Sequence, residues 1–147
     1  MRIKLAWMLG ILAAANGVFM LAAPAAWYAF APGVPNTGPL NAHFIRDIGA
    51  AFLVAGGSLV WFALDARARP AALACAAFFM LHALVHLSDA MTGRESIHQA
   101  VRDLPAVYLG ALLALWIAWP VSSPAMEEER DAQMVVTATD RRLRRGL

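Results

Sequence analysis

The fold is decided by uncharged apolar stretches, and the clearest of them is PAALACAAFFMLHALVHLS, residues 70–88. It contains no Asp, Glu, Lys or Arg. A helix of about 20 apolar residues spans the hydrocarbon core of a bilayer, which is roughly 30 Å thick. The stretch therefore predicts a transmembrane helix, and two histidines lie within it.

The remaining charges divide the chain in the same way. The 147 residues are 61% hydrophobic and 15% charged, and ten of the 22 charged side chains lie in residues 127–147. Such a composition excludes a water-soluble monomer. We predict an all-α bundle of four transmembrane helices in a domain of residues 1–123, followed by a charged tail, residues 124–147, that is disordered or partly helical. The predicted spans are residues 5–23, 46–64, 71–88 and 104–120.

The first uncharged gap, residues 5–45, is too long for a single helix. Its second half is rich in Pro and Gly, which predicts that the first helix ends near Ala23. We expect residues 24–39 either to fold over the outer end of the bundle as a lid or to form an irregular interfacial connector. A rival interpretation is a cleaved signal peptide, with a basic start and small residues at Ala22–Ala26. Cleavage would leave three spans, which conflicts with a basic tail on the inner side.

Orientation follows from the basic residues. With the N-terminus inside, nine of the twelve Lys and Arg residues are cytoplasmic. Only Arg46, Arg94 and Arg102 then lie outside, so the positive-inside rule places both termini in the cytoplasm.

Small residues predict where helices touch. Ala13 and Gly17 recur at four-residue spacing in the first span, as do Gly110, Ala114 and Ala118 in the fourth. An alanine-rich chain also produces such spacing by chance. Gly56 and Gly57 interrupt the second span and indicate a close packing point or a flexible spot.

The second and fourth spans share a pattern that suggests an internal repeat. Arg46-Asp47 opens one and Arg102-Asp103 opens the other, with His43 and His98 shortly before them. Because both helices would run from outside to inside, this pattern predicts a parallel two-helix repeat. The alternative is that an aspartate near a helix N-terminus is favoured by the helix dipole alone.

The third span carries the candidate site. His82, His86 and Asp89 share one helical stripe, because four- and three-residue spacings return to the same face. Ionisable groups inside a span are costly and usually face a polar interior, so we expect a His/Asp-lined pocket at the outer face. Imidazoles and carboxylates suit a transition metal, for which the predicted ligands are His43, Asp47, His82, His86 and Asp89. A haem b would use histidines on facing helices with an arginine on a propionate, from the set His43, Arg46, His82, His86 and Arg102.

Other functions fit the same residues. A histidine that titrates near neutral pH could pass protons to an aspartate, as in a proton- or quinone-linked redox or transport protein. The polar residues could also form a purely structural network within a subunit of a larger membrane complex. The sequence holds no Gly-rich phosphate loop, nucleophile elbow or cysteine pair, and no nucleic-acid-binding signature, so it predicts no catalytic class and no nucleic-acid partner.

The stretch Asn41–Leu53, with its His-x-x-Arg-Asp-x-Gly pattern and the later His82 and His86, resembles small uncharacterised four-helix bacterial membrane proteins of the DoxX-like type. The resemblance covers about residues 5–120. It implies the four-helix architecture and the bacterial inner membrane, and no agreed activity. We therefore predict an accessory or ligand-binding protein whose partners are the lipid bilayer and a second copy or a larger membrane complex.

Overall fold

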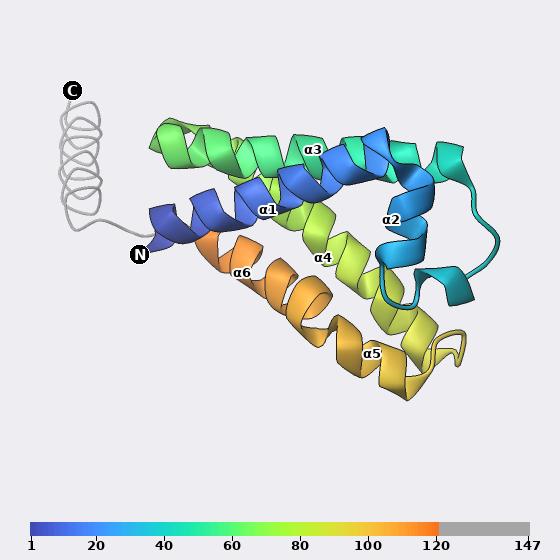
Figure 1. Cartoon of the computed structure of the whole chain (residues 1–147). Coiled ribbons are helices and arrows are strands. Elements are labelled where there is room, and N and C mark those ends of the chain that lie inside the picture. The colour runs from blue at the N-terminus through green and yellow to red at the C-terminus, as the bar shows by residue number, and fades with distance from the viewer. Residues whose placement is uncertain (121–147) are drawn as a thin grey trace, which may run out of the picture.

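The computed structural model describes residues 1–120, and these fold almost entirely into helices, with no strand among them. Four segments are long and apolar enough to cross a membrane: Arg2–Ala22, Ala42–Leu64, Ala66–Met91 and Ile97–Ala118. The predicted all-α bundle of four membrane helices is confirmed, while the predicted tail at 124–147 lies outside the described residues. The elements, shown in Figure 1, are α1 (Arg2–Ala22), α2 (Pro24–Phe30), η1 (Val34–Asn36), α3 (Ala42–Leu64), η2 (Ala66–Ala68), α4 (Arg69–Met91), α5 (Ile97–Asp103), η3 (Leu104–Tyr108) and α6 (Leu109–Ala118).

Two helices begin earlier than predicted because polar caps precede them. The side chain of Asn41 accepts a hydrogen bond from the Phe44 amide at 3.0 Å, so α3 begins at Ala42 and not at 46. Ser96 accepts from the Gln99 amide at 3.2 Å, so the last membrane segment begins at Ile97 and not at 104. Each cap satisfies an amide that has no partner within its helix.

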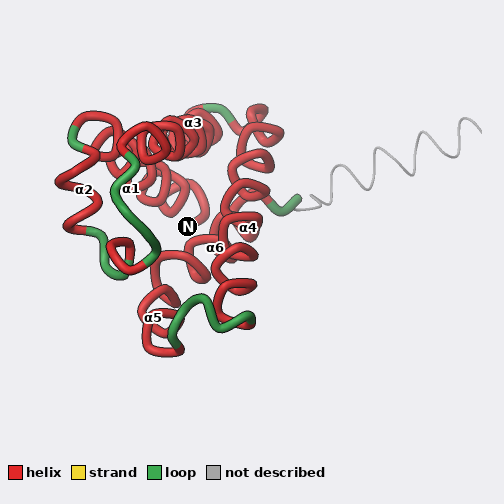
Figure 2. Tube along the Cα trace, turned by 90° about the vertical axis from the view of Figure 1, so that its right-hand side faces the viewer, coloured by secondary structure: helices red, strands yellow, loops and turns green. Residues whose placement is uncertain are grey.

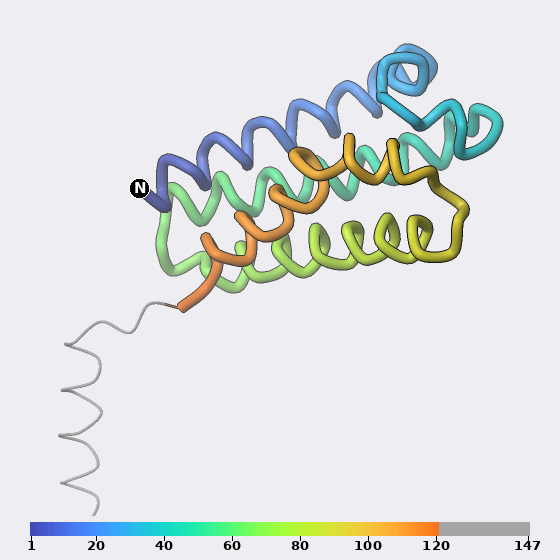
Figure 3. Tube along the Cα trace, turned by 90° about the horizontal axis from the view of Figure 1, so that it is seen from below, coloured from blue at the N-terminus to red at the C-terminus, as the bar shows by residue number. Residues whose placement is uncertain are grey.

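The closest contact in the bundle joins α1 to α3, which run side by side (Figures 1 and 3). Gly10 and Gly17 of α1 face Gly56 and Gly49 of α3 in antiparallel order. A Cβ added to Gly17 would lie 2.6 Å from the Gly49 carbonyl oxygen, so the backbones meet where a side chain cannot fit. The predicted contact face at Gly17, and the close packing at Gly56, are confirmed.

The second half of the chain packs less closely. In the end-on view of Figure 2, α4 and α6 lie beside the α1–α3 pair, and α6 contacts both α4 and α1. Ala114 and Ala118 of α6 are buried as predicted. The prediction for Gly110 was wrong, because no described neighbour outside its own helix lies within 4 Å of a Cβ placed there. Small alanines that reach the core, and not glycine, form this contact.

Residues 24–40, which we call the connector, are folded against the bundle. Trp27 of α2 donates its indole N–H to Asn16 of α1 at 2.9 Å, and the Tyr28 hydroxyl donates to the Gly38 carbonyl oxygen at 2.7 Å. The connector thus combines one short helix, a 3-10 turn and irregular segments, held together by these bonds. We call the end of the bundle that carries α2, η1 and α5 the capped end, visible on the right of Figure 1, opposite the N-terminal end.

Candidate functional site

A hydrogen-bonded histidine–aspartate pair joins α4 to α5 at the capped end. His86 Nδ1 lies 2.7 Å from Asp103 Oδ2, and these side chains are 29% and 13% exposed. Gln99, one turn before Asp103, donates its amide N–H to the other carboxylate oxygen at 3.2 Å. Both oxygens of Asp103 are therefore held in fixed directions by neighbours from two helices.

Glu95 completes a group of potential metal ligands. His86, Glu95 and Asp103 each present one ligand atom, and these atoms all lie within 4.8 Å of one another. It is the only such group of three or more His, Cys, Asp or Glu residues within residues 1–120. Oxygen Oε2 of Glu95 is buried and has no hydrogen-bond partner. A buried carboxylate oxygen without a partner is costly, and a proton or a cation would satisfy it.

The turn after α4 brings Glu95 to this position. The Asp89 carbonyl oxygen accepts from the amides of Arg94 and Glu95 at 2.9 and 3.1 Å, which folds the chain back over the end of α4. Gly93 lies at φ +73°, a left-handed conformation that glycine adopts without strain. The glutamate is therefore directed inward by backbone geometry.

Burial raises the pKa of Glu95 above its ordinary value, and the negative charge of the neighbouring Asp103 carboxylate raises it further. The positive charge that His86 can carry acts in the opposite direction. Glu95 consequently holds a proton more tightly than an exposed glutamate does. The three residues therefore gather one imidazole and two carboxylates, one of them with a raised pKa, at a single place.

A π-helical turn follows Asp103 directly. In η3 the Leu109 amide donates to the Leu104 carbonyl oxygen, five residues earlier. Pro105 has no amide hydrogen to donate, which loosens the ordinary helical ladder here. Single π turns occur frequently at functional sites, where they redirect neighbouring side chains. Here the turn separates α5, which carries the site, from the apolar α6.

On the membrane side of His86, His82 is surrounded by aromatic rings. The two imidazole centroids are 4.8 Å apart and meet edge to face at 73°. Phe78 stacks on His82 at 6.1 Å, and Phe52 of α3 meets it edge-on at 5.6 Å. The prediction that His82 and His86 lie together is confirmed. Neighbouring rings on one helix do not bracket a single haem iron, which agrees with the expectation that a haem would need facing helices.

The other predicted ligands lie elsewhere. His43 and Asp47 pair with each other on α3 at 3.5 Å, with side chains 88% and 61% exposed. Asp89 pairs with Arg94 at 3.6 Å. Within residues 1–120, the predicted metal set of His43, Asp47, His82, His86 and Asp89 is thus not gathered at one point.

The predicted arginines are also separate from the His86 pair. Arg46 Nε donates to the Leu21 carbonyl oxygen at 3.4 Å, which links α3 to the end of α1, and Arg102 is exposed on α5. Arg102 is adjacent to Asp103, but it is Asp103 that turns toward α4. The aspartate of the Arg-Asp pattern therefore contributes to the site in the second half of the chain, while Asp47 pairs with His43 of its own helix.

Two residues of the site were not predicted, Glu95 and Gln99. Ser96-x-x-Gln99 has the form of a capping box, in which the Gln side chain returns to the cap amide. Here Gln99 directs its amide to Asp103 and to the Pro32 carbonyl oxygen instead. The four-residue spacing of Gln99 and Asp103 was the available signal for their contact. Glu95 had no comparable signal, because the Gly93 turn positions it.

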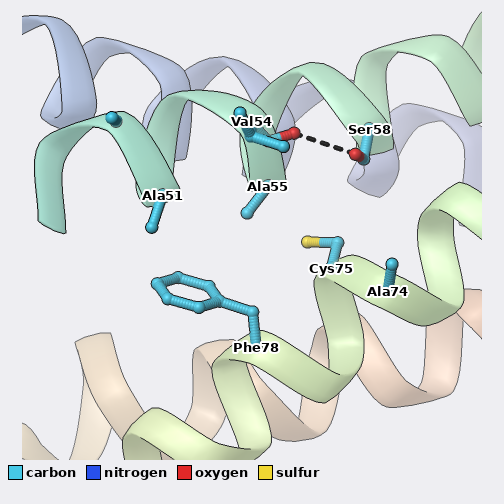
Figure 4. Close-up of a pocket in the computed structure, with 8 residues that line it drawn as sticks. Ala51, Val54, Ala55, Ser58, Ala74, Cys75 and Phe78 are labelled. Atoms are coloured by element: carbon cyan, nitrogen blue, oxygen red, sulfur yellow. Dashed lines mark hydrogen bonds between the residues drawn. The ribbon is translucent and has the colours of Figure 1, made fainter. Parts of the chain in front are cut away.

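A separate apolar groove of about 380 Å³ lies between α3 and α4. Figure 4 shows Phe78 and the Cys75 sulfur facing Ala51 and Ala55 across it. Ser58, on its rim, donates its hydroxyl to the Val54 carbonyl oxygen of its own helix at 2.8 Å. The groove therefore offers hydrocarbon contact and no charged group, unlike the His86 site.

No protein-family model, curated protein or solved structure matches the chain. The resemblance to DoxX-like membrane proteins accordingly stays a prediction.

Proposed function

We propose that this multi-pass membrane protein binds a divalent first-row transition-metal ion at its capped end, through His86, Glu95 and Asp103. The observation that carries the proposal is the convergence of these three ligand atoms within 4.8 Å, from α4, the following turn and α5. One imidazole and two carboxylates suit ions such as Zn²⁺, Mn²⁺ or Fe²⁺. The partnerless Glu95 oxygen supports the same proposal, because a cation would satisfy it.

The distances fit an ion after a small adjustment. Zinc bonds of about 2.0–2.2 Å place tetrahedral ligands roughly 3.3–3.6 Å apart. The His86–Asp103 contact at 2.7 Å is shorter than this, and the widest separation of up to 4.8 Å is longer. Loss of the shared proton would let the first pair separate, and rotation of the Glu95 side chain would close the gap. Binding would therefore release protons.

The charge distribution supports a location of the site on the outer side of the membrane. Arg2, Lys4, Arg67 and Arg69 lie at the N-terminal end of the bundle, where α1 begins and α3 turns into α4. The capped end carries the acidic cluster. Under the positive-inside rule the N-terminal end faces the cytoplasm, and the site opens to the outer side of a bacterial inner membrane. We infer an accessory role in which the protein holds or delivers the ion.

Proton handling is a second candidate that uses the same atoms. The 2.7 Å contact between His86 and Asp103, together with the raised pKa of Glu95, describes a group that takes up and releases protons. The two functions compete for one site, because a metal ion must displace the proton. Protonation of the ligands would lower the metal affinity of the site as the pH falls.

Equilibrium dialysis of the full chain in mild detergent against Zn²⁺, Mn²⁺ or Co²⁺, followed by elemental analysis, tests the proposal. We expect about one ion per chain in the wild type and in His43→Ala, which removes an exposed histidine of α3. We expect loss of that ion in His86→Ala and in Glu95→Gln, with helical content unchanged by circular dichroism. A wild type that retains no ion, or retention unaffected by both site variants, would contradict the proposal.

A further inference from the structure

Gln99 connects the candidate site to the connector that lies over the bundle. Its amide nitrogen donates to the Pro32 carbonyl oxygen at 3.0 Å and to Asp103 Oδ1 at 3.2 Å. The first bond joins residues 67 positions apart, and the second ends on a proposed metal ligand. One side chain thus holds the connector closed and occupies an oxygen of the site.

The connector is shaped to receive this side chain. Gly33 has φ +85°, which disfavours any residue with a side chain, and a Cβ placed there would overlap the Gln99 amide group. Glycine is therefore favoured at this position by its backbone angle, and its lack of a side chain leaves the space that the Gln99 amide group occupies.

The rest of the connector is bonded within itself and packs against α1 and α3. Trp27 bonds to Asn16, and Tyr28 bonds to the Gly38 carbonyl oxygen, so α2 and the segment after it are tied together. The junction between α1 and α2 at Ala23 has neither helical nor extended backbone angles, φ −140° and ψ 63°. On the far side, Gly38 at φ +148° has open space around it. These two points flank the segment that Gln99 of α5 bonds at Pro32.

We infer that the connector is a lid over the His86–Glu95–Asp103 site, with Gln99 as its latch. The inference rests on the proposed function, since the lid would control how a divalent metal ion enters and leaves that site. The Gln99 amide bridges the Pro32 carbonyl oxygen and Asp103 Oδ1, while Asp103 Oδ2 faces His86. Breaking the bond to Pro32 would free the connector from α5, so opening of the lid would control access to the His86 side of the carboxylate.

The accessibility of His86 in the metal-free protein tests the lid without any bound ion. Diethyl pyrocarbonate modifies accessible imidazoles, and peptide mass spectrometry gives the rate at each histidine. His43, with its side chain 88% exposed, serves as the reference within the same molecule. Gln99→Ala removes the latch, Gly33→Ala displaces it from the connector side, and Asn36→Ala is the matched control on the same segment.

We expect the ratio of the His86 rate to the His43 rate to rise about fivefold in Gln99→Ala and Gly33→Ala, as for the loss of one ordinary hydrogen bond. Asn36→Ala should leave the ratio at the wild-type value. An unchanged ratio in both latch variants, with helical content intact, would overturn the lid. Because the variants act from opposite sides of the contact, misfolding of one leaves the other informative.

A second experiment distinguishes failure of the lid from failure of the proposed metal site. Chelator-driven release of Zn²⁺ from the loaded protein should accelerate in the two latch variants by a similar factor. If zinc binds but leaves at the wild-type rate in both, the lid is overturned and the metal site stands. If the wild type binds no zinc, the metal site is overturned, and His86 modification still reports whether the lid exists.

Discussion

Replacing Gly56 by alanine should separate α1 from α3, and replacing its neighbour Gly57 should not. A Cβ on Gly56 would lie 2.5 Å from the Gly10 carbonyl oxygen and 2.9 Å from the Ala14 Cα. Both are backbone atoms of α1, which cannot rotate away as a side chain can. A Cβ on Gly57 would meet no atom within 4 Å outside its own helix. The two positions therefore differ in packing while sharing helix, depth and chemistry.

The expected difference in the free energy of unfolding between the two variants follows from two opposing effects. Alanine is favoured over glycine in a helix by about 1 kcal/mol, and this gain applies to both variants. Overpacking a tight contact costs about 1–3 kcal/mol, and this cost applies only at Gly56. The helix term cancels in the comparison, so Gly56→Ala should have a free energy of unfolding about 1–3 kcal/mol lower than Gly57→Ala.

Reversible unfolding in mixed micelles of mild detergent and sodium dodecyl sulfate, followed by circular dichroism, measures this difference. Gly110→Ala is a further control, because a Cβ there meets nothing within 4 Å outside its helix. Its free energy of unfolding should match that of Gly57→Ala. If Gly56→Ala proves as stable as Gly57→Ala, the close approach of α1 and α3 is not a feature of the folded protein.

Three further predictions concern the two ends of the bundle. Asp103→Asn should lower the free energy of unfolding by about 1–3 kcal/mol, because it weakens a partly buried bond between His86 and a charged group; an unchanged unfolding curve would refute the pairing. The raised pKa of Glu95 gives stability that is present below pH 4.5 and lost as pH rises through the pKa of the folded state. Glu95→Gln should therefore gain stability relative to the wild type with increasing pH, and a pH-independent difference would be inconsistent with this sign. Arg2→Ala should cost about 0.5–1 kcal/mol, since it removes a cation–π contact with Trp116, where the guanidinium carbon lies 4.7 Å from the ring centroid; the same unfolding assay would detect it.

The four membrane helices could be predicted because they depend on local composition. Uncharged stretches long enough to cross a bilayer leave few alternatives for the backbone, which must satisfy its own hydrogen bonds in lipid. The helix ends were less predictable, since Asn41 and Ser96 extend α3 and α5 beyond the apolar stretches. The charged residues mark the predicted boundaries of the spans, and the caps lie outside them. Polar residues in the first turns of these helices are compatible with the membrane interface.

Only those contacts of the site that lie within a single helix could be predicted from the sequence. His82 and His86 share a face because of their four-residue spacing, and their rings meet as that spacing requires. Asp89 shares that stripe, yet it pairs with Arg94. The partners of His86 depend on the Gly93 turn and on how α5 packs against α4, which no local pattern in the sequence specifies. Tertiary contacts therefore decide which carboxylates meet the histidine.

The packing of α1 against α3 illustrates an intermediate case. Ala13 and Gly17 indicated a contact face, but the partner glycines could not be assigned from spacing alone. Gly10 and Gly17 are seven residues apart, as are Gly49 and Gly56, so the two pairs match when the helices run antiparallel. Once Gly10 is known to face Gly56, the shared seven-residue spacing places Gly17 opposite Gly49. The four-residue spacing of Gly110 and Ala114 was also a sequence signal for helix contact, but Gly110 makes no close contact with a neighbouring helix.

X-ray absorption at the zinc edge tests the metal site most directly. The measurement uses the full chain in detergent, dialysed against Zn²⁺ and freed of excess ion. We predict one imidazole nitrogen and carboxylate oxygens at about 2.0–2.2 Å, with the imidazole signal lost in His86→Ala and retained in His43→Ala. A zinc ion without an imidazole ligand, or a chain that takes up no zinc, would contradict the assignment of His86, Glu95 and Asp103 as a metal site.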